Sequence, residues 1–300
     1  MTQFDFCLAW NWEYDADFAE ILSRASLRQG LSFLQATPGN LGRLLEALAK
    51  EEMKFRAFLD RASESDPAFL PLVEWAKARP VCRLNPQELA LKAMNKASMH
   101  LEFITAGIHT PYTIILPPFS ERAALPSLNL SPLGARFIIK PAHGGGGEGV
   151  VEEAASSEQV QGARQGFPQD YYLLQARIVP TNLAGKPGWF RVIFCGGKVY
   201  PCWWDPASHI YQAVKAEEEE TFGLGPLTTT TQLIFRICGL DMFSTEIALT
   251  SSGHFVSVDY VNDQIDLRLQ SKACDGVPDQ IVLEIADTLV EMVRRKLGST

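Results

Sequence analysis

The residues best suited to chemistry in this chain lie in one glycine-rich stretch, Phe137–Val151 (FIIKPAHGGGGEGVV). A short apolar segment ends at Lys140, a run of glycines follows, and a second apolar segment begins at Val150. Glycine lets a backbone approach a ligand closely. Consecutive N–H groups in such a turn form a concave site for phosphate oxygens, and a neighbouring lysine adds positive charge. The candidate phosphate-binding residues are Lys140, Gly144, Gly145, Gly146, Gly147 and Gly149.

This glycine run matches neither of the two common nucleotide-binding loops. No Lys-Ser/Thr pair follows it, as a P-loop requires, and the apolar segment after it predicts a strand where the dinucleotide fingerprint has a helix. The pattern therefore predicts a hairpin of two strands joined by a flap that covers phosphates. A flexible hairpin tip that binds nothing is the alternative.

A second group of polar residues lies in a late hairpin, Thr245–Asp263 (TEIALTSSGHFVSVDYVND). If Ser252-Gly253 is a two-residue turn, Glu246 lies directly opposite Asp259. Like charges in that position are destabilising unless a cation lies between them. Two carboxylates and the nearby amide of Asn262 are ligands that suit Mg²⁺. The alternative is an exposed hairpin with two hydrated acids.

Three successive units of strands and helices are expected to position these residues. In residues 1–85, alternating strand and helix patterns predict a small parallel sheet. Asn85 and Pro86 are expected to cap and begin a single helix that runs to about Ala106. We expect residues 86–175 to form a unit that carries the glycine flap. We expect residues 176–300 to form a unit that carries the acidic hairpin.

Composition limits the classes of function. The chain of 300 residues is 46% hydrophobic and carries a net charge of −8, so no basic face for nucleic acid is expected. No apolar run approaches the roughly 20 residues that span a bilayer, and the amino terminus lacks the pattern of a signal peptide. Six scattered cysteines without zinc spacing indicate reduced thiols. We expect a cytoplasmic protein that binds neither nucleic acid nor membrane.

Four stretches, taken in order, resemble motifs of the ATP-grasp superfamily, which includes D-alanine–D-alanine ligase, glutathione synthetase and biotin carboxylase. Asn95-Lys96 and the following AGIHTPYT resemble its leading motif, and Phe137–Val151 resembles its flap over the triphosphate. Residues 171–180 (YYLLQARIVP) resemble the hinge strand that holds adenine. Residues 239–263 resemble the strand pair that carries two acidic metal ligands and an asparagine.

The resemblance implies a mixed α/β and α+β fold, in which a small Rossmann-like N-terminal (pre-ATP-grasp) domain precedes a two-subdomain ATP-grasp fold. It also implies ATP and Mg²⁺ (or Mn²⁺) as cofactors. By resemblance, the residues that bind the nucleotide, in addition to the flap, are Lys96, Lys140, Gln175, Ala176 and Ile178. The residues that bind the metal are Glu246, Asp259 and Asn262.

Three departures from the family pattern stand out. The family has one residue between the last acidic ligand and the asparagine, whereas two separate Asp259 from Asn262, so a regular strand would turn them to opposite faces. Either a bulge or a strand end at Tyr260 restores the geometry, or Asp263 is the ligand. Trp189 stands two residues before Arg191, where many members have an acidic residue for the ribose. Asn95 replaces an aspartate.

The implied reaction is a ligation in which ATP phosphorylates a carboxylate and an amine or thiol attacks the acyl phosphate. Arg191 is the candidate clamp for the acyl phosphate, and Arg268 is a candidate for an anionic substrate group, unless Arg268 only pairs with Asp266. The substrates would be a small-molecule or peptide carboxylate and an amine or thiol acceptor, and dimers are common among such proteins. Candidates to line the acceptor pocket, or only the core, are Trp203, Trp204, His209 and Tyr211. A small-molecule kinase and a nucleotide-binding module without turnover are the alternative functions.

Overall fold

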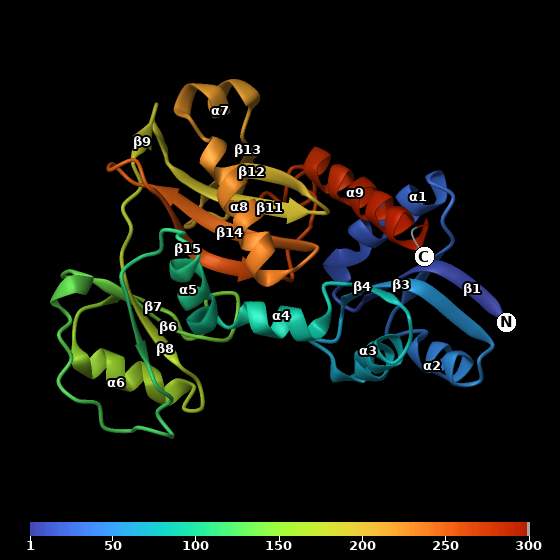
Figure 1. Ribbon diagram of the computed structural model, residues 1–300, viewed down its shortest axis with the longest axis horizontal. Coiled ribbons are helices and arrows are strands. Elements are labelled where there is room, and N and C mark those ends of the chain that lie inside the picture. Colours follow the sequence, from blue (N-terminus) through green and yellow to red (C-terminus); the bar gives the residue numbers. More distant parts are fainter. Residues whose placement is uncertain (299–300) are drawn as a thin grey trace.

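The computed structural model of the protein describes residues 1–298 and arranges them around three main β-sheets (Figure 1). A four-stranded sheet comes first in the chain, another four-stranded sheet lies in the middle, and a five-stranded sheet comes last. Within these residues, no helix combines the length and the apolar character that crossing a membrane would need. This is the mixed α/β and α+β architecture that the sequence predicts.

The N-terminal sheet is parallel throughout, with the strand order β2-β1-β3-β4. Its helices cover both faces, because Phe6 and Leu8 contact α1 while the alternate residues Cys7 and Ala9 contact α2 and α3. The predicted parallel sheet is confirmed. Its elements are β1 (Thr2–Trp10), α1 (Ala16–Arg28), β2 (Phe33–Ala36), α2 (Leu41–Ala49), β3 (Met53–Arg61), α3 (Leu70–Lys77) and β4 (Cys82–Leu84).

The junction after this sheet differs from the predicted single helix. The structure has two helices, α4 (Gln87–Met94) and α5 (Lys96–Thr105). Asn95 breaks the helix because its backbone is extended and its side-chain oxygen accepts the N–H of Ser98, which caps α5. The predicted cap at Asn85 is also wrong: this residue has a left-handed backbone, with φ of 52°, and its side chain accepts the N–H of Met242.

The middle sheet is antiparallel, with the order β5-β8-β6-β7. Its hairpin of β6 and β7 carries the glycine flap, as the sequence predicts. Helix α6 packs on this sheet through Val160, which lies in one core with Phe137 and Ile139. The elements are β5 (Thr113–Leu116), β6 (Phe137–Pro141), β7 (Val151–Ala154), α6 (Ser157–Gly166) and β8 (Tyr172–Ala176).

The third sheet is antiparallel, with the order β13-β12-β11-β14-β15. Gly196 and Gly197 form a two-residue turn between β11 and β12, and both have positive φ, of 56° and 97°, as such a turn requires. The strands are β11 (Trp189–Cys195), β12 (Lys198–Asp205), β13 (Ile210–Ala213), β14 (Met242–Leu249) and β15 (Phe255–Asn262). A separate hairpin pairs β9 (Asn182–Leu183) with β10 (Lys186–Pro187).

Helices cover both faces of the third sheet. Helix α9 (Asp279–Gly298) packs on the face that carries Ile193 and Cys195, and it lies beside α1 of the N-terminal unit (Figure 1). Helix α8 (Gly225–Cys238) packs on the opposite face against Phe194. The remaining helical elements are α7 (Ala216–Phe222) and the 3-10 turns Glu13–Asp15, Pro67–Phe69 and Ser131–Leu133.

A buried ion pair fastens the N-terminal sheet to the loop that follows β15. Arg61, at the end of β3, donates to both carboxylate oxygens of Asp15 at 3.0 and 2.7 Å, and both side chains are only 3% exposed. The same guanidinium donates to the carbonyl of Ile265 at 2.9 Å, in the loop that follows β15. Bidentate geometry of this kind is what makes a buried pair tolerable. The contact holds the carboxyl end of β3 against the end of the acidic hairpin.

We expect Asp15→Ala to lower the free energy of unfolding by about 3–5 kcal/mol, because it leaves the Arg61 charge buried without its carboxylate. Glu20→Ala is the matched control: it removes the exposed Glu20–Arg24 pair of α1, the helix that follows Asp15, and we expect it to cost less than about 1 kcal/mol. Denaturant unfolding measures both. Equal losses in the two variants would show that the buried pair does not fasten the two units.

Candidate active site

The charged residues of the acidic hairpin lie in one row across the third sheet. Strand pairing places Arg191 of β11 opposite Glu246 of β14, and Glu246 opposite Asp259 of β15. In the next row along the strands, Ser244 lies opposite Asn262. The three predicted metal-binding residues therefore share a face with Arg191. It is the same face that α9 covers farther along, where Ile193 and Cys195 lie.

The pairing of Glu246 with Asp259 is the predicted one, but the turn that leads to it is not. Leu249 pairs with Phe255, and the N–H of Thr250 donates to the carbonyl of His254, so the loop holds three residues. The predicted two-residue turn at Ser252-Gly253 is wrong. One extra residue in β15, between the partners of Ile247 and Glu246, restores the predicted pair. This irregularity is a β-bulge at Val258.

A second irregularity in β15 explains the unusual spacing of Asp259 and Asn262. Only Thr245 separates Ser244 from Glu246 in β14, but both Tyr260 and Val261 separate their partners in β15. This bulge gives Asp259 and Asn262 partners on one face of β14 although two residues lie between them. Of the two alternatives that the sequence leaves open, the structure contains the bulge.

Side chains stabilise the carbonyl groups of the bulged segment. The Lys140 ammonium donates to the Val258 carbonyl at 3.1 Å, and the Thr245 hydroxyl donates to the Asp259 carbonyl at 3.0 Å. Buried carbonyl groups without a partner are costly, so these two donors help to maintain the irregular backbone. Lys140 belongs to the flap hairpin, which means that the flap and the acidic hairpin meet at this point.

The two opposed carboxylates differ in their surroundings. Glu246 accepts from Arg191 at 3.2 Å and from the Trp189 indole at 3.1 Å, and burial raises its pKa although Arg191 favours the charged form. Burial would also raise the pKa of Asp259. Lys140, Lys96 and Arg191 outweigh it and hold that pKa below its ordinary value. The Lys140 ammonium lies 3.9 Å from the Asp259 carboxylate. A cation between the carboxylates would keep both ionised.

The side chains present fit a divalent cation of the Mg²⁺ type. Within residues 1–298, no group of three or more His, Cys, Asp or Glu side chains is arranged to hold a metal. Two carboxylates and one amide are nevertheless enough for Mg²⁺, which keeps several waters and uses phosphate oxygens. Within residues 1–298 the Asn262 side chain forms no hydrogen bond, so its amide oxygen is available to bind a cation. An Asp259 carboxylate with a low pKa is also the correct chemical form of a ligand.

Asp263, the alternative ligand, has a different environment. Its carboxylate accepts a hydrogen bond from Asn85, at the junction after the N-terminal sheet. Burial raises the pKa of Asp263 to about 7, and the negative charges of Glu64 and Asp60 add to this effect. Glu246 is paired with Asp259 and not with Asp263. This arrangement favours Asp259 as the ligand.

The glycine flap lies over the amino terminus of α5. Lys96 is the first residue of α5, and its ammonium donates to the Gly144 carbonyl at 2.5 Å. The backbones of Gly144, Gly146 and Gly147 have positive φ, of 103°, 61° and 79°. At Gly149 a Cβ would lie 2.6 Å from the Phe167 ring, so this position requires glycine for space as well. Lys96 and Lys140 are thus brought to one place, below the flap.

The predicted hinge follows directly from β8. Gln175 and Ala176 end this strand, with Gln175 paired to Thr113 and Ile138, and Ala176 paired to Phe137. Ile178 lies beyond the strand, and its N–H makes no hydrogen bond within the part of the chain that the structure describes. A free main-chain N–H is what an adenine ring nitrogen needs. The hinge, the two lysines and the carboxylate row lie on elements that adjoin one another.

No family model matches the sequence, and no curated protein matches it. Solved structures do resemble this protein's fold. The RimK domain protein ATP-grasp from Sphaerobacter thermophilus is 18% identical, with 96% of this chain and 98% of that chain covered and a TM-score of 0.63. D-alanine–D-alanine ligase from Bacillus anthracis, complexed with ATP, is 12% identical, with 99% of each chain covered and a TM-score of 0.64. The ATP-grasp ligase PsnB, complexed with minimal precursor, Mg and ADP, is 12% identical, with 97% and 98% covered and a TM-score of 0.64.

The chain has the ATP-grasp fold. Coverage of nearly the whole of both chains means that all three sheets take part in the likeness. Identities of this size establish the fold alone, so the activity has to be argued from this chain's own residues.

Within the ATP-grasp fold, the candidate substrate-binding residues divide into two groups. Trp204 and Tyr211 share the face of Arg191, whose guanidinium lies 5.0 Å from the Trp204 ring, and His209 stacks on Trp204. Trp203 belongs to the opposite face, where it contacts Phe190. Trp203 therefore packs on the side of the sheet away from the carboxylate row, whereas Trp204 adjoins Arg191 in that row. Trp204 and Tyr211 are also buried core residues, and His209 reaches this group only through Trp204.

Arg268 has two carboxylate partners in the structure. Its guanidinium lies 2.6 Å from Asp266 and 2.8 Å from Asp275, and these hydrogen bonds raise its pKa. It also lies 5.8 Å from the ring centres of both Trp12 and Tyr14, which follow β1. An anionic substrate would have to compete with Asp266 and Asp275 for this arginine. Pairing with Asp266 is the alternative that the sequence leaves open.

Some residues of the site escape the sequence-based prediction. Trp189 is identified there only as a departure from the family pattern, yet its indole holds Glu246. The alternation of side chains along β11 could have identified Trp189 as a site residue. Residues two apart in a strand share a face, and Arg191, two residues later, is a predicted site residue. His143, which bonds Asp170 at 2.8 Å beside the flap, has no sequence signal, because its partner lies 27 residues away.

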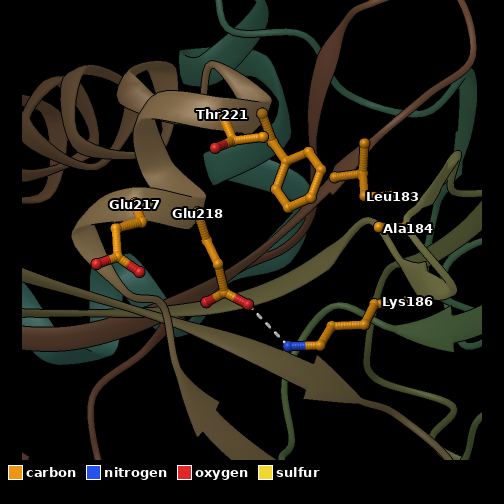
Figure 2. Close-up of a pocket in the computed structure, with 7 residues that line it drawn as sticks. Leu183, Ala184, Lys186, Glu217, Glu218 and Thr221 are labelled. Atoms are coloured by element: carbon orange, nitrogen blue, oxygen red, sulfur yellow. Dashed lines mark hydrogen bonds and ion pairs between the residues drawn. The ribbon is translucent and has the colours of Figure 1, made fainter.

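Two cavities lie away from the carboxylate row. One, of about 330 Å³, lies between the β9–β10 hairpin and α7, where Figure 2 shows Lys186 reaching Glu218 beside Leu183 and Thr221. The other, of about 340 Å³, is lined by residues of α8, of the β14–β15 connection and of the segment between α5 and β5, including His254 and His109. Neither cavity is lined by a predicted site residue.

We expect Asp263→Asn to stabilise the protein at pH 8 by at least about 1 kcal/mol and to have a smaller effect at pH 5. Asparagine keeps the acceptor for Asn85 and removes a buried charge. The pKa of Asp263 is about 7 in the folded protein and 3.8 in its ordinary state. Between these pH values the folded state therefore binds more protons than the unfolded state does. The wild type therefore loses stability as pH rises through this window.

Denaturant unfolding at the two pH values measures this difference. Asp287→Asn is the control, since it changes an exposed carboxylate paired with Arg28, and we expect less than about 1 kcal/mol at either pH. An Asp263→Asn variant that is destabilised at pH 8 would contradict a buried carboxyl group with a raised pKa.

Proposed function

We propose that the protein is an ATP- and Mg²⁺-dependent ligase that joins a carboxylate, activated as an acyl phosphate, to an amine or a thiol. The observation that carries the proposal is the position of Lys140. This flap-hairpin lysine bonds the Val258 carbonyl at 3.1 Å and lies 3.9 Å from the Asp259 carboxylate. A phosphate-binding loop and a pair of metal-binding carboxylates on opposite sides of the molecule could not serve one nucleotide.

Each group of residues has a distinct role in this proposal. The main chain of Gln175, Ala176 and Ile178 would hold the adenine. The flap N–H groups, together with Lys96 and Lys140, would hold the phosphates, and Lys96 would exchange the Gly144 carbonyl for a phosphate oxygen. Glu246, Asp259 and Asn262 would hold Mg²⁺, which neutralises phosphate charge when bound.

Such a reaction needs no nucleophile from the protein. The site has to align the substrate carboxylate with the γ-phosphate and stabilise the charge that develops in transfer. Arg191 is suited to clamp the acyl phosphate, because it lies in the carboxylate row beside Glu246 and is held by Trp204. Its pairing with Glu246 orients the guanidinium, while Trp189 holds the second oxygen of that carboxylate.

The fold relatives frame the choice of acid. One of them is a D-alanine–D-alanine ligase and another is a ligase complexed with a precursor. The acid substrate is accordingly sought among amino acids, other small carboxylates and peptides with acidic side chains.

The test is a screen of these acids with ATP and Mg²⁺ in the presence of hydroxylamine. We expect a competent acid to yield ADP and a hydroxamate, because hydroxylamine traps an acyl phosphate. A phosphorylated product without hydroxamate from any acid would contradict the ligase and indicate a kinase. ADP binding that is unchanged in Glu246→Ala and Asp259→Ala, together with no turnover of any acid, would indicate a binding module.

We expect Lys140→Ala to lower kcat/KM for ATP by about 10²-fold or more, because it removes a charged donor from the phosphates. Lys186→Ala is the matched control: this lysine is also paired with a carboxylate, that of Glu218, but it lies in the cavity beside α7. Steady-state kinetics measures both. Equal activities of the two variants would exclude Lys140 from the site.

A further inference from the structure

We infer that Tyr260 is a positioning residue for the metal site: its anchored side chain fixes the bulge that turns Asp259 and Asn262 to one face. The inference rests on the proposed function, which assigns a divalent cation to Glu246, Asp259 and Asn262. Tyr260 touches neither the nucleotide nor the cation in this account. It acts through the backbone of β15.

The Tyr260 side chain is held among elements of the neighbouring unit. It is fully buried, and its ring packs edge-on against Phe103 of α5, with 5.2 Å between ring centres and an interplanar angle of 72°. The His100 ring lies 5.7 Å away, and the Lys140 ammonium lies 5.3 Å from the Tyr260 ring centre. These contacts fix the side chain of the residue that follows Asp259.

The Tyr260 hydroxyl has two short hydrogen bonds. His100 Nδ1 and Gln175 Nε2 each lie 2.6 Å from it, and Gln175 also donates to the Thr113 hydroxyl at 3.2 Å. Burial lowers the pKa of His100 to about 4 and raises the pKa of Tyr260, so both groups are neutral near pH 7. The network joins β15 to α5 and to β8, the strand that ends at the hinge.

A bulge needs such an anchor because it competes with other registers. Tyr260 and Val261 together face the single residue Thr245, so a regular strand could form by moving either residue into the ladder. A shift of one residue would turn Asn262 to the opposite face. Lys140 and Thr245 hold the carbonyls of Val258 and Asp259, on the amino-terminal side of this bulge. Tyr260 holds the bulge itself, through a side chain that cannot follow a shift without breaking its two hydrogen bonds.

The test measures Mn²⁺ binding, which needs no substrate acid. Free Mn²⁺ is followed by electron paramagnetic resonance in the presence of saturating ADP, and ADP binding without metal is measured by calorimetry in EDTA. We expect Tyr260→Phe to raise the Kd for Mn²⁺ by about 10-fold, the size of effect that residues behind metal ligands have. We expect ADP binding in EDTA to remain within about two-fold.

Tyr200→Phe is the matched control. Tyr200 is a buried tyrosine of the same sheet, and its hydroxyl bonds Thr288 at 3.1 Å on the part of the face that α9 covers. We expect both variants to lose comparable thermal stability, and only Tyr260→Phe to lose Mn²⁺ affinity. If Tyr260→Phe does not fold, His100→Leu removes one anchor of the same hydroxyl, and we expect it to raise the Kd for Mn²⁺ by at least about three-fold.

The outcomes separate this inference from the proposed function. If Tyr260→Phe binds Mn²⁺ as tightly as the wild type, the inference is overturned, although the proposed metal site stands. The same result in His100→Leu has the same meaning if Tyr260→Phe does not fold. Equal losses of Mn²⁺ affinity in Tyr260→Phe and Tyr200→Phe also overturn it, since the effect would then be general destabilisation. A wild-type protein that binds ADP but no Mn²⁺ overturns the proposed metal site, and the inference with it.

Discussion

The contact of Lys140 with the bulged strand β15 is the interaction on which the rest of the site depends. A buried ammonium is unfavourable without anionic or carbonyl partners, and burial lowers the pKa of Lys140 accordingly. Its partners are the Val258 carbonyl and the Asp259 carboxylate. One side chain thereby joins the sheet that carries the flap to the sheet that carries the acids.

The third sheet provides the rigid support. A single face carries apolar side chains under α9 and, farther along, the row of Arg191, Glu246 and Asp259. Opposed carboxylates are tolerated because Arg191, Trp189 and Lys140 surround them. The buried pair of Arg61 and Asp15 holds the N-terminal sheet against the loop that follows this row. The flap sheet and the N-terminal sheet therefore contact the third sheet at β15 and at the loop that follows it.

The sequence predicts the parts of the site that depend on local pattern. The glycine hairpin and the parallel N-terminal sheet are confirmed, since alternation and turn residues report on near neighbours. The Glu246–Asp259 pair is also present, but the turn from which it is predicted is wrong, and the pair depends on the bulge at Val258. The sequence offers the bulge at Tyr260 only as one alternative and does not indicate the bulge at Val258, because such irregularities depend on donors such as Lys140 that lie far away in the chain. The break at Asn95 is not predicted for another reason: this capping residue lies inside an apolar pattern that is typical of one continuous helix.

The central claim is that one nucleotide is held between the flap and the carboxylate row. A crystal structure with ADP and Mn²⁺, with the metal located by its anomalous scattering, tests it most directly. We expect Mn²⁺ between Glu246 and Asp259, with the diphosphate beneath the flap glycines and adenine beside Ile178. Mn²⁺ bound elsewhere, or a nucleotide that leaves the flap and the acidic hairpin without a shared ligand, would contradict it.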